Sequence, residues 1–171
     1  MTRPVVSAVG VTVLVTLGLG TLWLLGMRTK WPLVIDTQRR INRTFINPRT
    51  MKAAGTPGAT ASIVQHTGRT TGKSYATPVG PFATDDGFII VLPYGTRPDW
   101  LRNVMAAGSA TIVREGKAYP VDRLEILPIH AADAFLPDAE KRSLRLFGVD
   151  QCLRVRHAES GSGAGEGRAS R

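Results

Sequence analysis

A glycine-containing segment from His66 to Val79 carries the side chains best suited to binding an anion. Two glycines let the backbone curl between two strand-like runs, and two cations and two hydroxyls surround the same bend. These residues are Gly68, Gly72, Arg69, Lys73, Thr70 and Thr71. Backbone N–H groups, hydroxyls and paired cations on one concave bend suit a phosphate or a similar anion. The segment alone leaves open a solvated turn whose basic residues bind nothing.

A second segment, Leu92 to Gly108, places aromatic and amide side chains beside the start of a predicted helix. Gly95 follows the end of a strand and lets the backbone approach a ligand closely. Tyr94 precedes this glycine, and Trp100 and Asn103 lie in the first turns of the helix. An indole, a phenol and an amide near a helix N-terminus suit a flat ring with polar edges and an anionic tail. Taken alone, Trp100 is better explained as a core residue.

Short strands linked by turns predict the scaffold that positions these residues. The expected strands cover residues 60–65, 74–79, 87–93, 110–114, 117–119 and 122–127. Hairpin turns are expected at Asp85-Asp86-Gly87 and Glu115-Gly116, and helices from Pro98 or Asp99 to Ala107 and from Pro137 or Asp138 to Phe147. The pattern predicts a mainly β domain with flanking helices, curled into a small closed or half-closed barrel.

The N-terminal region carries an uncharged apolar run of 23 residues, from Val5 to Met27. As a helix this run would extend roughly 34 Å, which is enough to cross the hydrocarbon core of a bilayer. A secretory signal is the alternative, but the run is longer than the apolar region of such a signal and lacks a small-residue cleavage site. We therefore expect residues 1–30 to form an uncleaved, single-pass membrane anchor.

A basic cluster follows the apolar run. Seven Lys or Arg residues and one acid, Asp36, lie between residues 28 and 52. The positive-inside rule therefore predicts a single-pass protein of the cell membrane with everything after the run in the cytoplasm. The same cluster would be attracted to anionic lipid headgroups. No interleaved aromatic and basic pattern suggests base stacking, so no nucleic-acid partner is expected. Asp36 is expected to cap a helix that ends near Arg49.

Composition shifts divide the rest of the 171-residue chain. Residues 31–56 are expected to form a basic juxtamembrane helix or linker, 57–157 the barrel domain, and 158–171 a disordered tail. Cys152 is the single cysteine, so no intrachain disulfide can form, and it is expected to be a small buried apolar residue. The three histidines lack the spacing of metal ligands, so no metal is expected.

Together, the two glycine-containing segments resemble the deazaflavin-dependent nitroreductase family, split-barrel quinone and nitro reductases that use coenzyme F420. The similarity covers about residues 57–153. The residues that carry it are His66-x-Gly-Arg-x-x-Gly-Lys73, Thr77-Pro78, Asp86-Gly87, Asp99-Trp-x-Arg-Asn103 and Ala107-Gly108. Several separated matches in the right order make the resemblance specific, whereas the first motif alone would be weak.

The resemblance implies an FMN-binding-like split β-barrel that binds reduced deazaflavin in a groove. It implies that the cofactor's tail is held by Arg69, Thr71, Gly72 and Lys73, one side of the ring by Tyr75, Thr77, Pro78 and Val79, and the other side by Tyr94, Gly95, Trp100 and Asn103. Tyr94 then becomes the candidate catalytic residue, donating to the developing oxyanion of the acceptor. The resemblance implies an acceptor pocket formed by aromatic residues near the C-terminus. Here the residues after Phe147 offer Cys152 and arginines and no tyrosine, so the acceptor stays undefined.

The leading hypothesis is an F420H2-dependent oxidoreductase that passes a hydride to a quinone, a nitro compound or a similar lipophilic acceptor, such as menaquinone, at the membrane. One alternative keeps the barrel but uses FMN as its cofactor. The other is a non-catalytic, membrane-anchored protein that binds deazaflavin or a lipid. The sequence leaves open whether the protein assembles as a homodimer.

Overall fold

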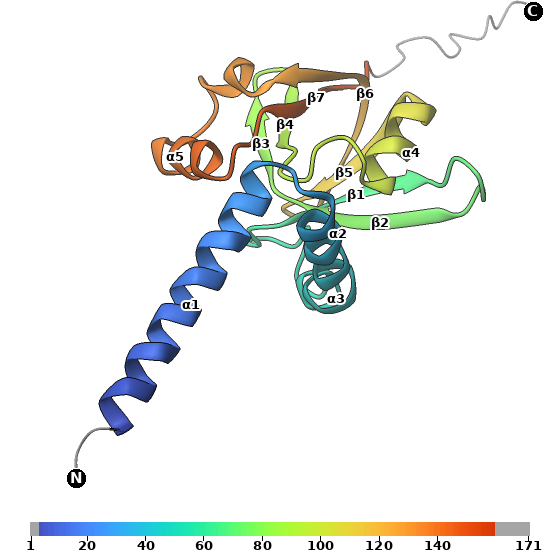
Figure 1. The fold of residues 1–171 in the computed structure, drawn as a ribbon. Coiled ribbons are helices and arrows are strands. Elements are labelled where there is room, and N and C mark those ends of the chain that lie inside the picture. Colours follow the sequence, from blue (N-terminus) through green and yellow to red (C-terminus); the bar gives the residue numbers. More distant parts are fainter. Residues whose placement is uncertain (1–3, 160–171) are drawn as a thin grey trace, which may run out of the picture.

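The computed structural model describes residues 4–159, without the side chains of residues 4–11 and of Phe45. A curved sheet forms the body of the molecule, helices flank it, and one long helix projects away from it (Figure 1). The predicted tail, residues 158–171, lies almost entirely outside the described residues.

Seven antiparallel strands form a single sheet in the order β2-β1-β5-β6-β7-β4-β3. Their bounds are β1 (Ser62–Thr67), β2 (Ser74–Val79), β3 (Pro81–Thr84), β4 (Gly87–Val91), β5 (Ser109–Arg114), β6 (Lys117–Pro128) and β7 (Gln151–His157). The two edge strands, β2 and β3, are separated in the chain by Gly80 alone, so the sheet must curl until its edges approach each other. This curled sheet with flanking helices confirms the predicted split-barrel architecture.

Alternating side chains fill the inside of the curl. Along β1, Val64 and His66 are buried while Gln65 and Thr67 are exposed, as expected for a strand with one face on a core. The main core cluster comprises Val64, Phe88, Ile90, Leu92, Leu101, Val104, Ile112, Val121, Leu153 and Val155. Burial of this apolar surface provides the main driving force for forming the barrel.

Two helices lie against the sheet. Helix α4 (Asp99–Ala107) begins after Pro98 and ends at Gly108, whose φ of 67° terminates the helix. It buries Leu101 and Val104 in the main core. Helix α5 (Asp138–Leu146) and the short 3-10 helix η2 (Ile129–Ala132) belong to a second cluster around Ile89, which also includes the buried Cys152.

The N-terminal part is more helical than the sequence predicts. Helix α1 (Pro4–Arg28) is followed by α2 (Pro32–Ile41), a π-helical segment η1 (Asn42–Ile46) and α3 (Asn47–Thr50). The prediction that Asp36 caps this helix is wrong, because the helix already begins at Pro32, whose fixed φ suits the first turn. Asp36 instead lies one turn inside and pairs with Arg39.

An elbow joins α1 to the barrel. Arg28 Nη1 donates to the carbonyl oxygens of Arg145 (2.9 Å) and Leu146 (3.3 Å), which lie at the C-terminal end of α5. The rings of Trp23 and Phe147 meet edge to face. Gly26 allows the close crossing of α1 and α2. The C-terminal end of α1 is therefore fixed to the domain at several points.

Among the residues whose side chains the structure describes, no single helix is long and apolar enough to cross a bilayer. Residues Thr12–Arg28 and Pro32–Thr50 meet that requirement when they are taken as one pair, bent by 100°. The predicted membrane anchor therefore remains a prediction.

The structure contains two strands that the sequence pattern did not predict, and it joins two of the predicted strands into one. β3 and β7 were not predicted, and residues 117–119 and 122–127 belong to the single strand β6, which has an irregularity between Asp122 and Glu125. β7 was not predicted, although Leu153, Arg154, Val155 and Arg156 alternate apolar and charged side chains as a strand with one buried face does. Both arginines pair with Asp86, the residue expected to serve only in a turn.

Replacing Gly87 tests the close packing of β4 on β7. A Cβ at Gly87 would meet the Val155 carbonyl oxygen and lie 2.8 Å from Arg156 Cα, so backbone atoms would have to move. We expect Gly87→Ala to lower the free energy of unfolding by about 1–3 kcal/mol in denaturant titrations. The control is Gly80→Ala, where a Cβ meets no atom within 4 Å. Equal stability of the two variants would contradict this packing.

Candidate functional site

A groove of about 1110 Å³ lies between the N-terminal helices and the barrel. Its first wall comes from α2, η1 and α3, and its second from the segment after β1, from β2, and from the start of α4. The first wall contributes Asp36, Arg39, Arg40, Asn42, Arg43, Thr44, Asn47, Pro48 and Met51. The groove therefore brings a basic helix face against the two segments singled out from the sequence.

The bend from Gly68 to Lys73 is held shut by its own backbone. Gly68 N–H donates to Lys73 O (2.8 Å), and Gly72 N–H donates to Gly68 O (2.9 Å). Gly72 has a φ of 65°, and a Cβ on Gly68 would lie 2.7 Å from the ring of Tyr75. Both glycines are therefore required, one for its backbone conformation and the other for the close approach of Tyr75.

Arg69 joins this bend to the start of α4. Its Nη2 lies 3.1 Å from Asp99 Oδ1, and its Nη1 donates to Asn103 Oδ1 (2.7 Å). The Arg69 backbone N–H donates to the same oxygen (3.2 Å). The Asp99 side chain is 66% exposed, so its ion pair with Arg69 contributes little stability in itself. Its role in the structure is to fix the direction of the guanidinium at the groove.

His66 and Asn103 form a buried polar pair at the side of the groove. Asn103 Nδ2 and His66 Nδ1 are 3.2 Å apart, and His66 Nε2 lies 3.2 Å from Thr77 Oγ1. The imidazole also stacks on Tyr75, with ring centroids 5.7 Å apart. Burial lowers the pKa of His66 below its usual value because desolvation disfavours the charged ring.

Tyr94 crosses from the barrel toward the N-terminal helices. Its hydroxyl accepts a hydrogen bond from Asn42 Nδ2 (2.5 Å). Burial raises the pKa of Tyr94, and the Asn42 hydrogen bond opposes that rise only in part. The phenol is therefore neutral at physiological pH, and its own hydrogen can be donated to a group in the groove.

The structure brings eight of the twelve predicted cofactor-binding residues into the groove lining. These are Arg69, Thr71, Tyr75, Thr77, Pro78, Tyr94, Trp100 and Asn103. The other four do not line it. Gly72 and Lys73 lie at the far end of the bend, Val79 packs against the main core, and Gly95 has a φ of 66° in the turn after β4. Their assignment to the cofactor remains a prediction.

Sequence reasoning missed the first wall of the groove. Residues 31–56 were expected to link the membrane anchor to the barrel, yet their helical part faces the predicted site. The signal available in the sequence was weak. Asn42 and Asn47 interrupt an otherwise basic helix face, and uncharged amides at such positions often have a partner.

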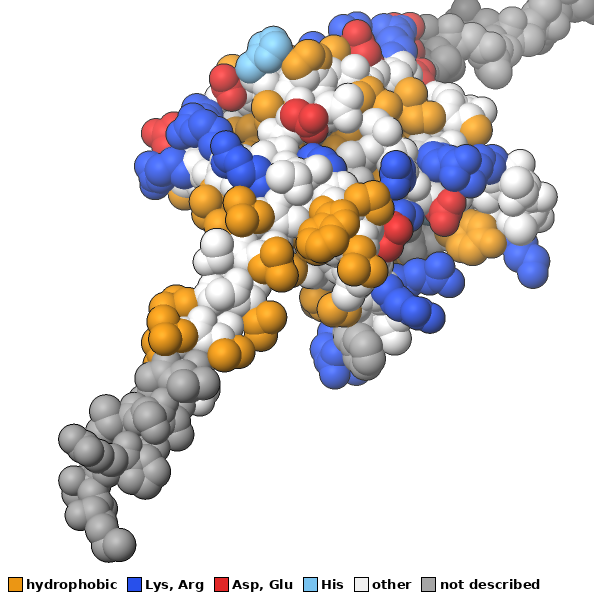
Figure 2. All heavy atoms as spheres, in the orientation of Figure 1, with side chains coloured by type: hydrophobic (Ala, Val, Ile, Leu, Met, Phe, Trp, Pro, Cys, Tyr) orange, Lys and Arg blue, Asp and Glu red, His pale blue; other side chains and the backbone are white. Residues whose placement is uncertain are grey.

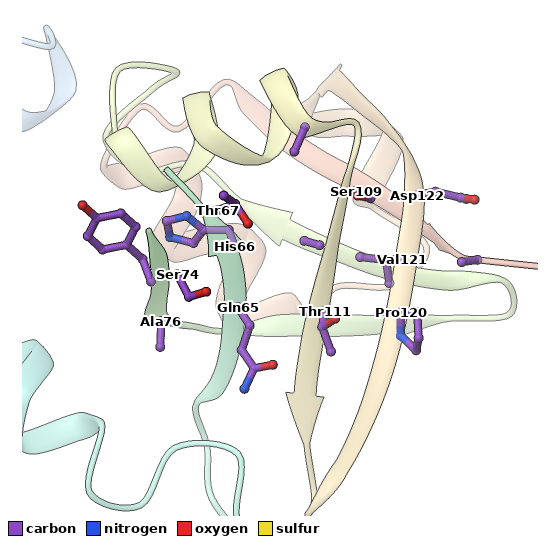
Figure 3. Close-up of a pocket in the computed structure, with 14 residues that line it drawn as sticks. Gln65, His66, Thr67, Ser74, Ala76, Ser109, Thr111, Pro120, Val121 and Asp122 are labelled. Carbon is purple, nitrogen blue, oxygen red and sulfur yellow. The ribbon is translucent and has the colours of Figure 1, made fainter. Parts of the chain in front are cut away.

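A second hollow of about 790 Å³ lies beside β1, β2, β5 and β6 (Figure 3). Short side chains such as Ser74, Ala76, Ser109 and Thr111 line most of it. Asp122 is its one charged lining residue, so no group of converging donors is available for an anion. The groove beside α2 is therefore the better candidate site.

Comparison with known proteins gives one family and several distant structures. The sequence model of a family described as F420H(2)-dependent quinone reductase matches residues 37–144. The solved structure of an F420-H2 dependent reductase is 15% identical, covering 57% of this chain and 94% of its own, with a TM-score of 0.42. A structure described as a domain-swapped dimer is 15% identical, covering 71% of this chain and 98% of its own, with a TM-score of 0.44.

A third structure comes from Clostridium acetobutylicum and is related to general stress protein 26 of B. subtilis, in the pyridoxinephosphate oxidase family. It is 13% identical, covering 66% of this chain and 80% of its own, with a TM-score of 0.43. No match was found among curated proteins.

The buried imidazole makes a pH prediction. In the unfolded chain His66 binds a proton below about pH 6.5, whereas in the folded protein its lowered pKa means that protonation requires a lower pH. We therefore expect the free energy of unfolding to fall as the pH drops below 6.5 and to level off below the folded pKa. In urea titrations across this range, His66→Gln should lose this component.

The exposed His130 supplies the control, since His130→Gln should keep the full pH dependence of the parent protein. The same loss of stability in His66→Gln and in the parent would contradict the prediction.

Proposed function

Because the chain belongs to the F420H2-dependent quinone reductase family, we propose that its groove binds coenzyme F420 and presents the reduced cofactor to a lipophilic acceptor. The family model begins inside α2 and ends inside α5, so it includes both walls of the groove. The single observation that carries the proposal is this groove, in which aromatic, cationic and hydroxyl side chains converge.

The groove residues suit a flat ring with an anionic tail. Tyr75, Tyr94 and Trp100 offer aromatic surface, and Arg39, Arg40, Arg43 and Arg69 line the same space. Asp36 and Asp99 are the acids among the lining residues, and each is paired with an arginine. Arginines are strong partners for phosphate and carboxylate groups, so the basic α2 wall would hold the tail.

The chemistry requires positioning more than acid–base catalysis. Reduced F420 supplies a hydride from its deazaflavin carbon when it is bound. The chain's own contribution would be to hold the ring and the acceptor in contact. Tyr94, kept neutral by burial and oriented by Asn42, would donate its hydrogen to the oxygen that gains charge on the acceptor.

The long helix α1 supports a membrane setting for this reaction. Most of its described apolar side chains are exposed, including Leu14, Leu17, Leu19 and Leu22, and it projects from the domain (Figures 1 and 2). We propose that α1 anchors the protein in the cell membrane with the barrel in the cytoplasm, where the groove would meet quinones such as menaquinone.

Cofactor binding is the first test. The full chain in detergent should bind oxidised F420, detected by quenching of its fluorescence, and should not bind FMN. Arg40→Gln combined with Arg43→Gln should weaken binding about three- to tenfold, because charge-assisted contacts at a partly exposed site are screened by water and salt.

The control replaces Lys117 and Arg142 by Gln, two exposed cations outside the groove lining, and should leave the affinity unchanged. Failure of the folded parent protein to bind F420 would refute the proposal. Binding without turnover of any quinone or nitro acceptor would favour a non-catalytic binder.

The Tyr94 hydroxyl is the second test. Tyr94→Phe removes the donor and keeps the ring, so kcat for quinone reduction should fall at least about tenfold while the affinity for F420 changes little. Tyr119→Phe is the matched control, because Tyr119 packs on Phe88 and His157 outside the groove lining. An unchanged kcat in Tyr94→Phe would exclude this role.

A further inference from the structure

A chain of polar contacts crosses the barrel side of the groove from the start of α4 to β2. It runs from Asp99 through Arg69, Asn103 and His66 to Thr77, with successive separations of 3.1, 2.7, 3.2 and 3.2 Å. His66 is 8% exposed and Asn103 is 6% exposed, so neither can exchange these partners freely with water. All five side chains belong to residues that line the groove.

Arg69 fixes the orientation of the Asn103 amide. The Arg69 backbone N–H and its Nη1 both donate to the same Asn103 atom, and a guanidinium and a backbone N–H are donors only. That atom must therefore be the amide oxygen. The opposite orientation would place the Asn103 NH2 group against two donors inside a buried site, which is unfavourable. The NH2 group consequently points at His66.

The amide in turn fixes the tautomer of His66. Since Asn103 Nδ2 donates, the Nδ1 atom of the imidazole has to accept and carries no hydrogen. The ring is neutral, so its one hydrogen is on Nε2. If Nδ1 carried a hydrogen, it would face the Asn103 NH2 group, which is also a donor. The Asn103 amide cannot turn over to relieve this, because Arg69 is bound to its oxygen, and the His66 ring is stacked on Tyr75.

The tautomer determines what Thr77 can do. His66 Nε2–H donates to Thr77 Oγ1, so the hydroxyl oxygen is already an acceptor. Within the described part of the chain, the Thr77 hydroxyl makes no other side-chain hydrogen bond, and it belongs to the groove lining. Its own hydrogen is thus available to a ligand.

We propose that His66 is a positioning residue which, held by Asn103, makes Thr77 a hydrogen-bond donor to an oxygen or ring nitrogen of the cofactor. The inference rests on the proposed binding of F420 in this groove. It predicts that the groove selects a ligand with an acceptor atom opposite Thr77. It also links the bend to β2, because Arg69 orients Asn103, and through His66 this orientation leaves the Thr77 hydroxyl free to donate.

The tautomer can be measured without any cofactor. Long-range ¹H–¹⁵N NMR spectra of the full chain in detergent at neutral pH should show His66 with Nε2 protonated and Nδ1 bare. The signal is assigned by its absence from His66→Gln. In Asn103→Asp the donor is lost and a carboxylate faces Nδ1, so the neutral ring should carry its one hydrogen on Nδ1 instead of Nε2, and Nε2 should then accept from the Thr77 hydroxyl. An Nδ1–H tautomer in the parent protein would overturn the inference.

The donor role is measured by F420 binding. Thr77→Val keeps the shape of the side chain and removes the hydroxyl, so the dissociation constant for oxidised F420 should rise about three- to tenfold, as for one neutral hydrogen bond. Thr77→Ser restores the hydroxyl and should bind within about twofold of the parent protein. A double variant with Asn103→Asp and Thr77→Val should lose less than the sum of the single losses, because both act through one hydroxyl.

The outcomes separate the two proposals. If the parent protein binds no F420, the proposed function fails and this inference fails with it. If the parent binds F420 and the Val and Ser variants bind it equally well, the inference alone is overturned. Thr77→Val and Thr77→Ser differ by the hydroxyl at a half-buried strand position, so their comparison remains decisive even if Asn103→Asp does not fold.

Discussion

The single residue between β2 and β3 is the constraint on which the rest of the structure depends. A sheet whose first and last strands are consecutive in the chain cannot stay open, so it curls around one apolar core. The curl leaves β2 bonded to β1 on one side only, and α3 lies against it. The groove is the space that remains between this edge of the barrel and the N-terminal helices. Loss of the closure would remove the site together with the core.

The polar residues of the site are ordered before any ligand arrives. Arg69 is paired with Asp99 and Asn103, and Tyr94 is held by Asn42 from the opposite wall. Such contacts reduce the conformational freedom that binding would otherwise have to remove. The sequence predicts Arg69 as an anion-binding cation. In the structure its guanidinium also holds Asp99 and Asn103 in place. Arg40 of α2 and Arg43 of η1 also line the groove and are better placed to meet an anion.

Local sequence signals predicted the parts of the fold that local interactions determine. β2, α4 and the turn at Glu115 and Gly116 were predicted because proline, glycine and apolar spacing act over a few residues. β7 was not predicted although Leu153, Arg154, Val155 and Arg156 alternate as in a half-buried strand; what the sequence could not show is that both arginines pair with the distant Asp86. The first wall of the groove was missed because Tyr94, which Asn42 contacts across the groove, is 52 residues away. Pairing between residues so far apart leaves no local signal in one chain.

The elbow at Arg28 determines which face of the long helix α1 is turned toward the domain. Each residue of an α-helix turns its side chain by about 100°, so adding or removing one residue of α1 between Trp23 and Arg28 would rotate the preceding part of the helix about its axis. With Arg28 still on the α5 carbonyls, Trp23 would then point away from Phe147. Lys30, with a φ of 55°, already makes a turn that few residues adopt. The elbow therefore fixes both the direction of α1 relative to the domain and the rotation of α1 about its own axis.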